Sequence, residues 1–362
     1  MTQPFYPHNP ITADCVATPW NMYFWNNVSA LLQPGHNGDA AACPSDSDCW
    51  ISHTGASRAP APSPSPSLLP SSGNATNRST HWHWQLSVTL LLVASPRPGD
   101  SRDRGDMLLR NLAATRMTTG LTHSQAVVMF DGMLCRQKDP TGAIGTAYFQ
   151  KIFAVWKAFQ RHDRSSVVVH TKWLHLAELA RRTMLLDIFP ATPLVFVMQE
   201  DHQIVPHVSL GTPIPGIHEI VHLMLQNEHG PRRVNCVHFT QRLAGTDPYH
   251  GRCYSGSDDK LCKTHPSYPS IPLRSTATFN DQPHLIRRSH YEDVVWQTVP
   301  RGYRTATEHH ANAFATSEGN WSGWIYAGPA TNTHTTQTGN KYVSSYAAMS
   351  GAVQLKENPL AL

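Results

Sequence analysis

Several classes of protein are excluded by what the sequence has little of. Only 15% of the 362 residues are charged, and the net charge is +4 with histidine neutral, so no nucleic-acid partner is expected. No apolar run reaches the roughly 18 residues of a membrane span. Residues 1–30 lack the basic segment and apolar core of a signal peptide, so the localisation stays open, with the cytoplasm as default.

The cysteines also lack the spacings that mark a disulfide framework or a metal site. The seven cysteines are odd in number and contain no C-x-x-C pair, which argues against a complete disulfide framework or a zinc ribbon. Cys43 with Cys49, and Cys253 with Cys262, could each close a local loop. Histidine is abundant instead, with 22 copies, which favours metal chemistry and equally favours accidental metal-like motifs. Nothing in this pattern fixes the oligomeric state.

One low-complexity segment divides the chain. Residues 55–80 are rich in proline and serine and cannot form a core, so they are predicted to be a linker or a surface insertion. Residues 1–54 show no sustained periodicity and are expected to be irregular. The predicted organisation is an irregular N-terminal region over 1–80, a folded domain over 81–342 and a C-terminal tail over 343–362.

The first half of the folded domain alternates short apolar runs with helical patterns. Buried strands are predicted at 84–93, 125–130, 166–170 and 194–198. A helix is predicted over 107–117, and Thr171 is expected to cap another helix. Such alternation favours an α/β fold with a largely parallel sheet and right-handed crossovers.

Polar residues follow these strands where each one ends. Ser95, Asp131-Gly132 and Glu200-Asp201 occupy such positions, which predicts a nucleotide site along one sheet edge. Arg97, in the loop after the first strand, could contact phosphates or stay solvated. Asp131 could accept from a ribose or base, or cap a turn.

The segment after the 194–198 strand has the composition of a metal site. Glu200, Asp201 and His202 suit a divalent cation that holds a diphosphate, although a solvated acidic turn has the same composition.

A rival metal motif lies in the helix predicted over 217–228. His218-Glu219-x-x-His222 has the spacing that zinc peptidases use. The longer peptidase pattern fails, because Leu225 and Glu228 occupy the positions of its glycine and third histidine. A zinc-dependent hydrolase and a structural or solvated histidine pair both remain open.

The C-terminal third holds further candidates. Glu308 lies beside two histidines and could be a general base or a surface acid. His334 could be a metal or phosphate ligand or a loop residue. Trp321, Trp324 and Tyr326 could stack on a sugar ring or pack in the core.

Taken in order, these motifs over residues 84–342 resemble nucleotide-sugar glycosyltransferases of the GT-A fold. Glu200-Asp201-His202 stands where that fold carries its DXD-type motif. It is similar to the Glu-Asp-His form of some N-acetylglucosaminyltransferases and to the Glu-His-Asp form of a loosely defined microbial, algal and viral group. Residues 276–285 resemble that group's Trp/Phe-x-x-x-Pro-His-Leu segment, and 321–328 its Trp-x-x-x-x-Tyr-Gly strand. His334 with Gly339 resembles a degraded His-x-x-Gly.

The resemblance implies a GT-A-like, Rossmann-type sheet that transfers a sugar from a UDP- or GDP-sugar to a glycan or other hydroxyl acceptor. It implies Mn²⁺ or Mg²⁺ held by Asp201 with His202 and His334, with Glu200 also at the donor. It places the nucleoside against Ser95, Arg97, Asp131 and Gly132, and it makes Glu308 the base, with Asp281 in reserve. A non-catalytic carbohydrate-binding relative is a further alternative.

Overall fold

The fold is taken from a computed structural model of the chain. It describes residues 40–42, 49–53, 84–96, 104–132, 143–159, 165–170, 174, 176–187, 189–206, 217–226, 233–239, 273–276, 279, 282–298, 323–326 and 330–334. Only the backbone is described for 40–42, 49–53, 143, 205–206, 274–275, 325–326 and 330–334.

Four parallel strands form the centre of the sheet. They are β3 (Val88–Ala94), β4 (Gln125–Phe130), β5 (Ser165–His170) and β6 (Leu194–Gln199). Their spatial order is β5-β4-β3-β6, with parallel pairing throughout. Nearly every residue in them is buried, which explains why they appear in the sequence as continuous apolar runs.

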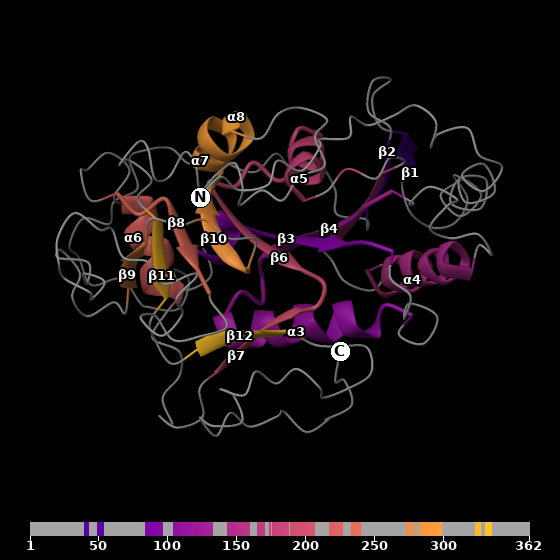
Figure 1. The fold of residues 1–362 in the computed structure, drawn as a ribbon, viewed down its shortest axis with the longest axis horizontal. Coiled ribbons are helices and arrows are strands. Elements are labelled where there is room, and N and C mark those ends of the chain that lie inside the picture. Colours follow the sequence, from indigo (N-terminus) through magenta and orange to yellow (C-terminus); the bar gives the residue numbers. More distant parts are fainter. Residues whose placement is uncertain are drawn as a thin grey trace, which may run out of the picture.

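Six further strands extend this centre to both sides (Figure 1). They are β1 (Ala40–Ala42), β2 (Cys49–His53), β8 (Cys236–His238), β9 (Leu273–Thr276), β10 (His284–Arg287) and β11 (Gly323–Tyr326). The full order is β1-β2-β5-β4-β3-β6-β10-β8-β11-β9. β10 runs antiparallel to β6 and β8, whereas β8 and β11 are parallel. The predicted α/β class is confirmed: a mixed sheet, mostly parallel through its centre, is flanked by helices.

β1 and β2 come from the region that the sequence indicated to be irregular. β2 pairs antiparallel with β5, and β1 pairs antiparallel with β2. A five-residue strand is too short to show a period of its own, so its pairing with β5 is not visible in the sequence.

Helices cover both faces of the sheet. On one face lie α3 (Asp106–Thr119), α4 (Ala143–Phe159) and α6 (Ile217–Gln226), whose apolar residues join one core cluster. On the other lies α5 (Leu176–Met184), with the helical run Arg288–Thr298. That run consists of α7 (Arg288–His290), the π-helical segment η6 (Tyr291–Val295) and α8 (Trp296–Thr298). Figure 1 shows α3 and α5 on opposite sides of the central strands.

The predicted helix over 107–117 is confirmed as α3. It ends at Thr119, and the capping residue Gly120 that follows has a φ of 71°, in the left-handed region that glycine adopts without strain. Within the described ranges, no helix is long and apolar enough to cross a membrane.

A separate two-stranded sheet lies beside α3 (Figure 1). It consists of β7 (His202–Pro206) and β12 (Ala330–His334), which pair antiparallel. The Ile204 backbone N–H lies 3.4 Å from Thr115 Oγ1 of α3, and Ile204 is fully buried in the cluster that α3 joins. β7 therefore follows β6 directly and is anchored against α3.

Candidate functional site

The chain leaves the carboxyl ends of β3 and β6 in opposite directions. β3 is followed by β4 on one side, while the next strand of this sheet along the chain after β6 is β8, on the other side. In open α/β sheets ligands bind outside the carboxyl ends of strands at such a reversal. Ser95 follows β3 and Glu200 follows β6, and the Ser95 backbone N–H lies 3.4 Å from Glu200 Oε1. The structure thus brings these two predicted residues together across 105 positions of sequence.

Glu200 is held by a buried ion pair. Its Oε2 lies 2.6 Å from Nζ of Lys151 on α4, and both side chains are 0% exposed. Lys151 Nζ also donates to the Ser95 carbonyl at 3.2 Å, and Asn111 of α3 donates to the Glu200 carbonyl at 2.7 Å. A buried carboxylate needs such compensation. Glu200 therefore ties β3, β6, α3 and α4 together.

Lys151 is a residue that the sequence reasoning missed. A signal was present, because Tyr148, Ile152 and Val155 form an apolar stripe at helical spacing and Lys151 interrupts it. A lysine in such a stripe indicates a buried acidic partner, but the sequence does not say which acid it is.

Asp131 is also committed to the fold. It is 1% exposed, and its Oδ1 accepts from the backbone N–H groups of Gly132 at 2.9 Å and Leu174 at 2.7 Å. The Tyr148 hydroxyl lies 2.8 Å from the Asp131 carbonyl and 3.0 Å from the Ala94 carbonyl. These contacts are those of a strand-end cap, and they join the ends of β3 and β4 to the segment before α5.

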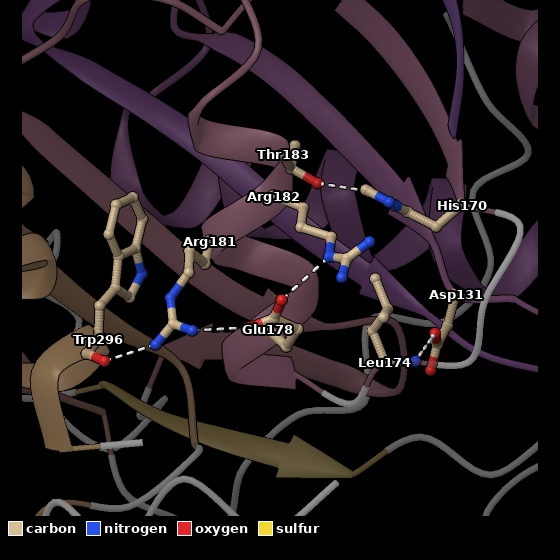
Figure 2. A network of polar contacts seen from close by, with 8 residues as sticks. All are labelled: Asp131, His170, Leu174, Glu178, Arg181, Arg182, Thr183 and Trp296. Carbon is tan, nitrogen blue, oxygen red and sulfur yellow. Dashed lines mark hydrogen bonds and ion pairs between the residues drawn. The ribbon is translucent and has the colours of Figure 1, made fainter. Parts of the chain in front are cut away.

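Figure 2 shows how this edge continues onto α5. Glu178 pairs with Arg181 at 2.7 Å and with Arg182 at 2.9 Å, and Arg181 donates to the Trp296 carbonyl. These contacts join α5 to α8 on the face of the sheet opposite α3.

His170, the last residue of β5, also lies in this network. Its Nε2 is 2.9 Å from Thr183 Oγ1 of α5 (Figure 2). Burial, with a smaller effect from Arg182, lowers the pKa of His170 to about 3. The imidazole is therefore neutral and structural at neutral pH.

The three predicted metal ligands lie at or beside the start of β7. Asp201 is in the turn between β6 and β7 and is partly exposed, whereas His202 is 2% exposed. In the β7–β12 register His334 stands directly opposite His202. Directly opposed residues are the closest neighbours across an antiparallel pair. The fold thus brings a position from the middle of the predicted domain together with one near its C-terminal end.

Some predicted residues lie outside the described part of the chain. These are Arg97, Asp281 and Glu308, and the same holds for the side chain of His334. Among the described side chains, no three His, Cys, Asp or Glu residues are placed to hold a metal ion. The Asp201, His202 and His334 set is not tested by that finding, because it includes His334.

The H-E-x-x-H motif lies on α6, whose apolar residues Ile217, Val221 and Met224 are buried. His218 and His222 approach each other, with 3.0 Å between their Nε2 atoms. Burial, and then the neighbouring His218, lower the pKa of His222. No third ligand of the kind that zinc peptidases need is found among the described side chains.

A second buried group lies where β8 and β10 pair. His284 stands opposite His238 in register, both are 0% exposed, and their ring centroids are 5.3 Å apart. His284 Nδ1 is 2.7 Å from the Gln282 carbonyl, and burial lowers the pKa of His284 to about 4. Burial raises the pKa of the Cys236 thiol, whose sulfur lies 3.4 Å from His238 Nε2. His284 and the Cys236 thiol are therefore neutral at pH 7.

Among the three aromatic residues of the C-terminal run, Trp324 belongs to the core. It is 8% exposed and joins the cluster on the α3 face. Trp321 and the side chain of Tyr326 lie outside the described part.

Comparison with known proteins yields no family model that matches the chain and no curated protein with significant similarity to it. A functional assignment therefore depends on the arrangement of the sheet edge and on the β7–β12 pair.

Proposed function

We propose that the protein is a GT-A-like glycosyltransferase that moves a sugar from a nucleotide-sugar donor to a hydroxyl acceptor with the help of a divalent cation. The observation that supports it most is the register that sets His334 opposite His202, immediately after the acidic end of β6. These positions belong to separate short motifs, and an α/β fold as such does not require them to meet.

The residues present fit a divalent cation. Carboxylate oxygen and imidazole nitrogen are donors that Mn²⁺ accepts, and carboxylate oxygen alone suits Mg²⁺. The ion would be held by Asp201, with His202 and His334, and it would neutralise the diphosphate leaving group. Glu200 is not assigned as a ligand of this ion, because its Oε2 pairs with Lys151 and the side chain is 0% exposed.

The chain's own residues then have distinct tasks. Lys151 and Glu200 fix the backbone at Ser95 and Asp201, so the donor meets a rigid edge. Asp131 orients Gly132 at the end of β4, beside the expected nucleoside position. Glu308, with Asp281 as the reserve, stays the proposed acceptor base from the resemblance.

Nucleotide binding tests the proposal directly. Unfolding of the wild type is followed with UDP, GDP and their sugar conjugates, with and without Mn²⁺, and donor consumption is assayed with mixed hydroxyl acceptors. At 100 times the Kd, a bound nucleotide stabilises the fold by about 2.7 kcal/mol. Asp201→Asn, which preserves shape, is expected to lose the Mn²⁺-dependent part.

Asp187→Asn is the matched control, since Asp187 is exposed beyond α5 and outside the proposed site. It is expected to keep the full response. A wild type that no nucleotide stabilises, or an Asp201→Asn variant that responds like the wild type, would contradict the proposal.

A further inference from the structure

The proposed transferase makes no use of the histidine pair on α6, and its geometry points to a separate site. We propose that His218 and His222 bind a first-row transition-metal ion such as Ni²⁺, Cu²⁺ or Zn²⁺. The two histidines are four residues apart on one helix face, with 3.0 Å between their Nε2 atoms.

The separation suits a chelate. Metal–nitrogen bonds to histidine are about 2.0–2.1 Å, so nitrogens 3.0 Å apart subtend roughly 91–97° at a shared ion. That angle is the cis angle of square-planar and octahedral coordination, which Cu²⁺ and Ni²⁺ adopt. Zn²⁺, which prefers a tetrahedral arrangement, needs only a small opening of the pair.

The pair is held in place yet accessible. The His218 ring packs edge-on against Trp84, with centroids 5.3 Å apart and planes at 71°. Trp84 is 8% exposed, and the apolar residues Ile217 and Val221 fix α6 in the core. His218 is half-buried and His222 is exposed, so an ion can reach both nitrogens from solvent.

The pair lies far from the proposed donor site. Trp84 precedes the amino end of β3, whereas Ser95, Glu200 and Asp201 follow the carboxyl ends of β3 and β6. The two sites are therefore at opposite edges of the central strands and can be lost independently. Glu219, one residue from His218, is about 100° around the helix and is not assigned as a ligand.

Titration calorimetry with Ni²⁺ tests the site on the full chain without a histidine tag. Ni²⁺ is preferred to Cu²⁺ because it does not oxidise the cysteine thiols. The wild type is expected to bind one more tight Ni²⁺ ion than His218→Asn or His222→Asn. In either variant the affinity at this site falls by more than the roughly 10–100-fold that loss of an outer-shell partner costs.

Three variants separate a chelate from scattered binding. His218→Asn/His222→Asn is expected to behave like either single variant, since one lost ligand already removes the chelate. His123→Asn, at an exposed histidine elsewhere, and Glu219→Gln are expected to bind Ni²⁺ like the wild type. Equal binding by all variants, additive losses, or loss in Glu219→Gln would overturn the two-imidazole assignment. Nucleotide and Mn²⁺ responses are expected to be unchanged in His222→Asn, so this test fails or succeeds apart from the transferase proposal.

Discussion

The acidic end of β6 and the histidine pair of α6 have similar sequence signatures, but the fold uses them differently. Glu200 is 0% exposed, pairs with Lys151 and lies against the backbone at Ser95. His222 is exposed, and its Nε2 contacts His218 of the same helix. The comparison teaches that residue type predicts which chemistry is possible, whereas burial and partners decide whether a side chain is available for it.

The largest expected effect comes from breaking the buried ion pair between Lys151 and Glu200. Lys151→Met leaves the buried Glu200 carboxylate without its counter-charge, which costs about 3–5 kcal/mol of unfolding free energy. Urea unfolding measures the loss. Lys151→Met/Glu200→Gln is expected to recover most of it, because no uncompensated charge remains. A single variant as stable as the wild type would show that the ion pair does not hold this edge.

The next effect is a pH dependence from His170, buried at the same edge. Its pKa of about 3 lies below the ordinary histidine value of 6.5, so between these values the unfolded chain binds a proton that the folded chain does not. Stability is therefore full above pH 6.5 and falls as the pH drops toward 3. The loss is about 1.4 kcal/mol per pH unit, or roughly 2 kcal/mol at pH 5.

Unfolding free energies at pH 7, 6 and 5 measure this slope. His170→Gln is expected to reduce the slope of the unfolding free energy against pH by the contribution of one proton. His123→Gln, at an exposed position, is expected to leave the slope unchanged. An unchanged slope in His170→Gln would mean that the imidazole is protonated in the folded protein.

A smaller effect is expected at the backbone support of Glu200. Asn111→Ala removes the donor to the Glu200 carbonyl and is expected to cost about 1 kcal/mol. The variant also sharpens the comparison, since Asn111 orients the turn that carries Asp201. The affinity of the Asn111→Ala variant for Mn²⁺-nucleotide is expected to weaken together with its stability. A variant with wild-type stability and binding would show that this hydrogen bond does not order the turn.

The smallest effect is expected at His222, the exposed member of the histidine pair. His222→Asn is expected to change the unfolding free energy by less than about 0.5 kcal/mol in metal-free buffer, as exposed substitutions usually do. With Ni²⁺ added, the wild type should gain stability over the variant. A large loss without metal would place His222 among the residues committed to the fold.

The sequence predicted the central strands because short apolar runs bounded by breakers have few other uses. It also predicted that Ser95, Asp131 and Glu200 follow the carboxyl ends of the central strands. It did not predict that Lys151 reaches Glu200, because that distance is set by how α4 packs on the sheet. α4 itself was overlooked, although Tyr148, Ile152 and Val155 have helical spacing.

The β7–β12 pair could not be predicted from the sequence, for a different reason. β7 is five residues long and begins with His202-Gln203, so neither its length nor its hydrophobicity marks it as a strand. Its partner is supplied by a segment near the far end of the domain. Pairings of this kind depend on the packed structure and leave no local pattern.

The β7–β12 pair also has a kinetic consequence. A ribosome adding about 5–20 residues per second needs on the order of ten seconds to pass from β7 to β12. During that time the central strands can fold, whereas β7 cannot pair because β12 has not yet been synthesised. Closing so long a loop costs little extra entropy at equilibrium, but non-local pairing slows the search. Positions 202 and 334 therefore meet late, and binding that requires both would report complete folding.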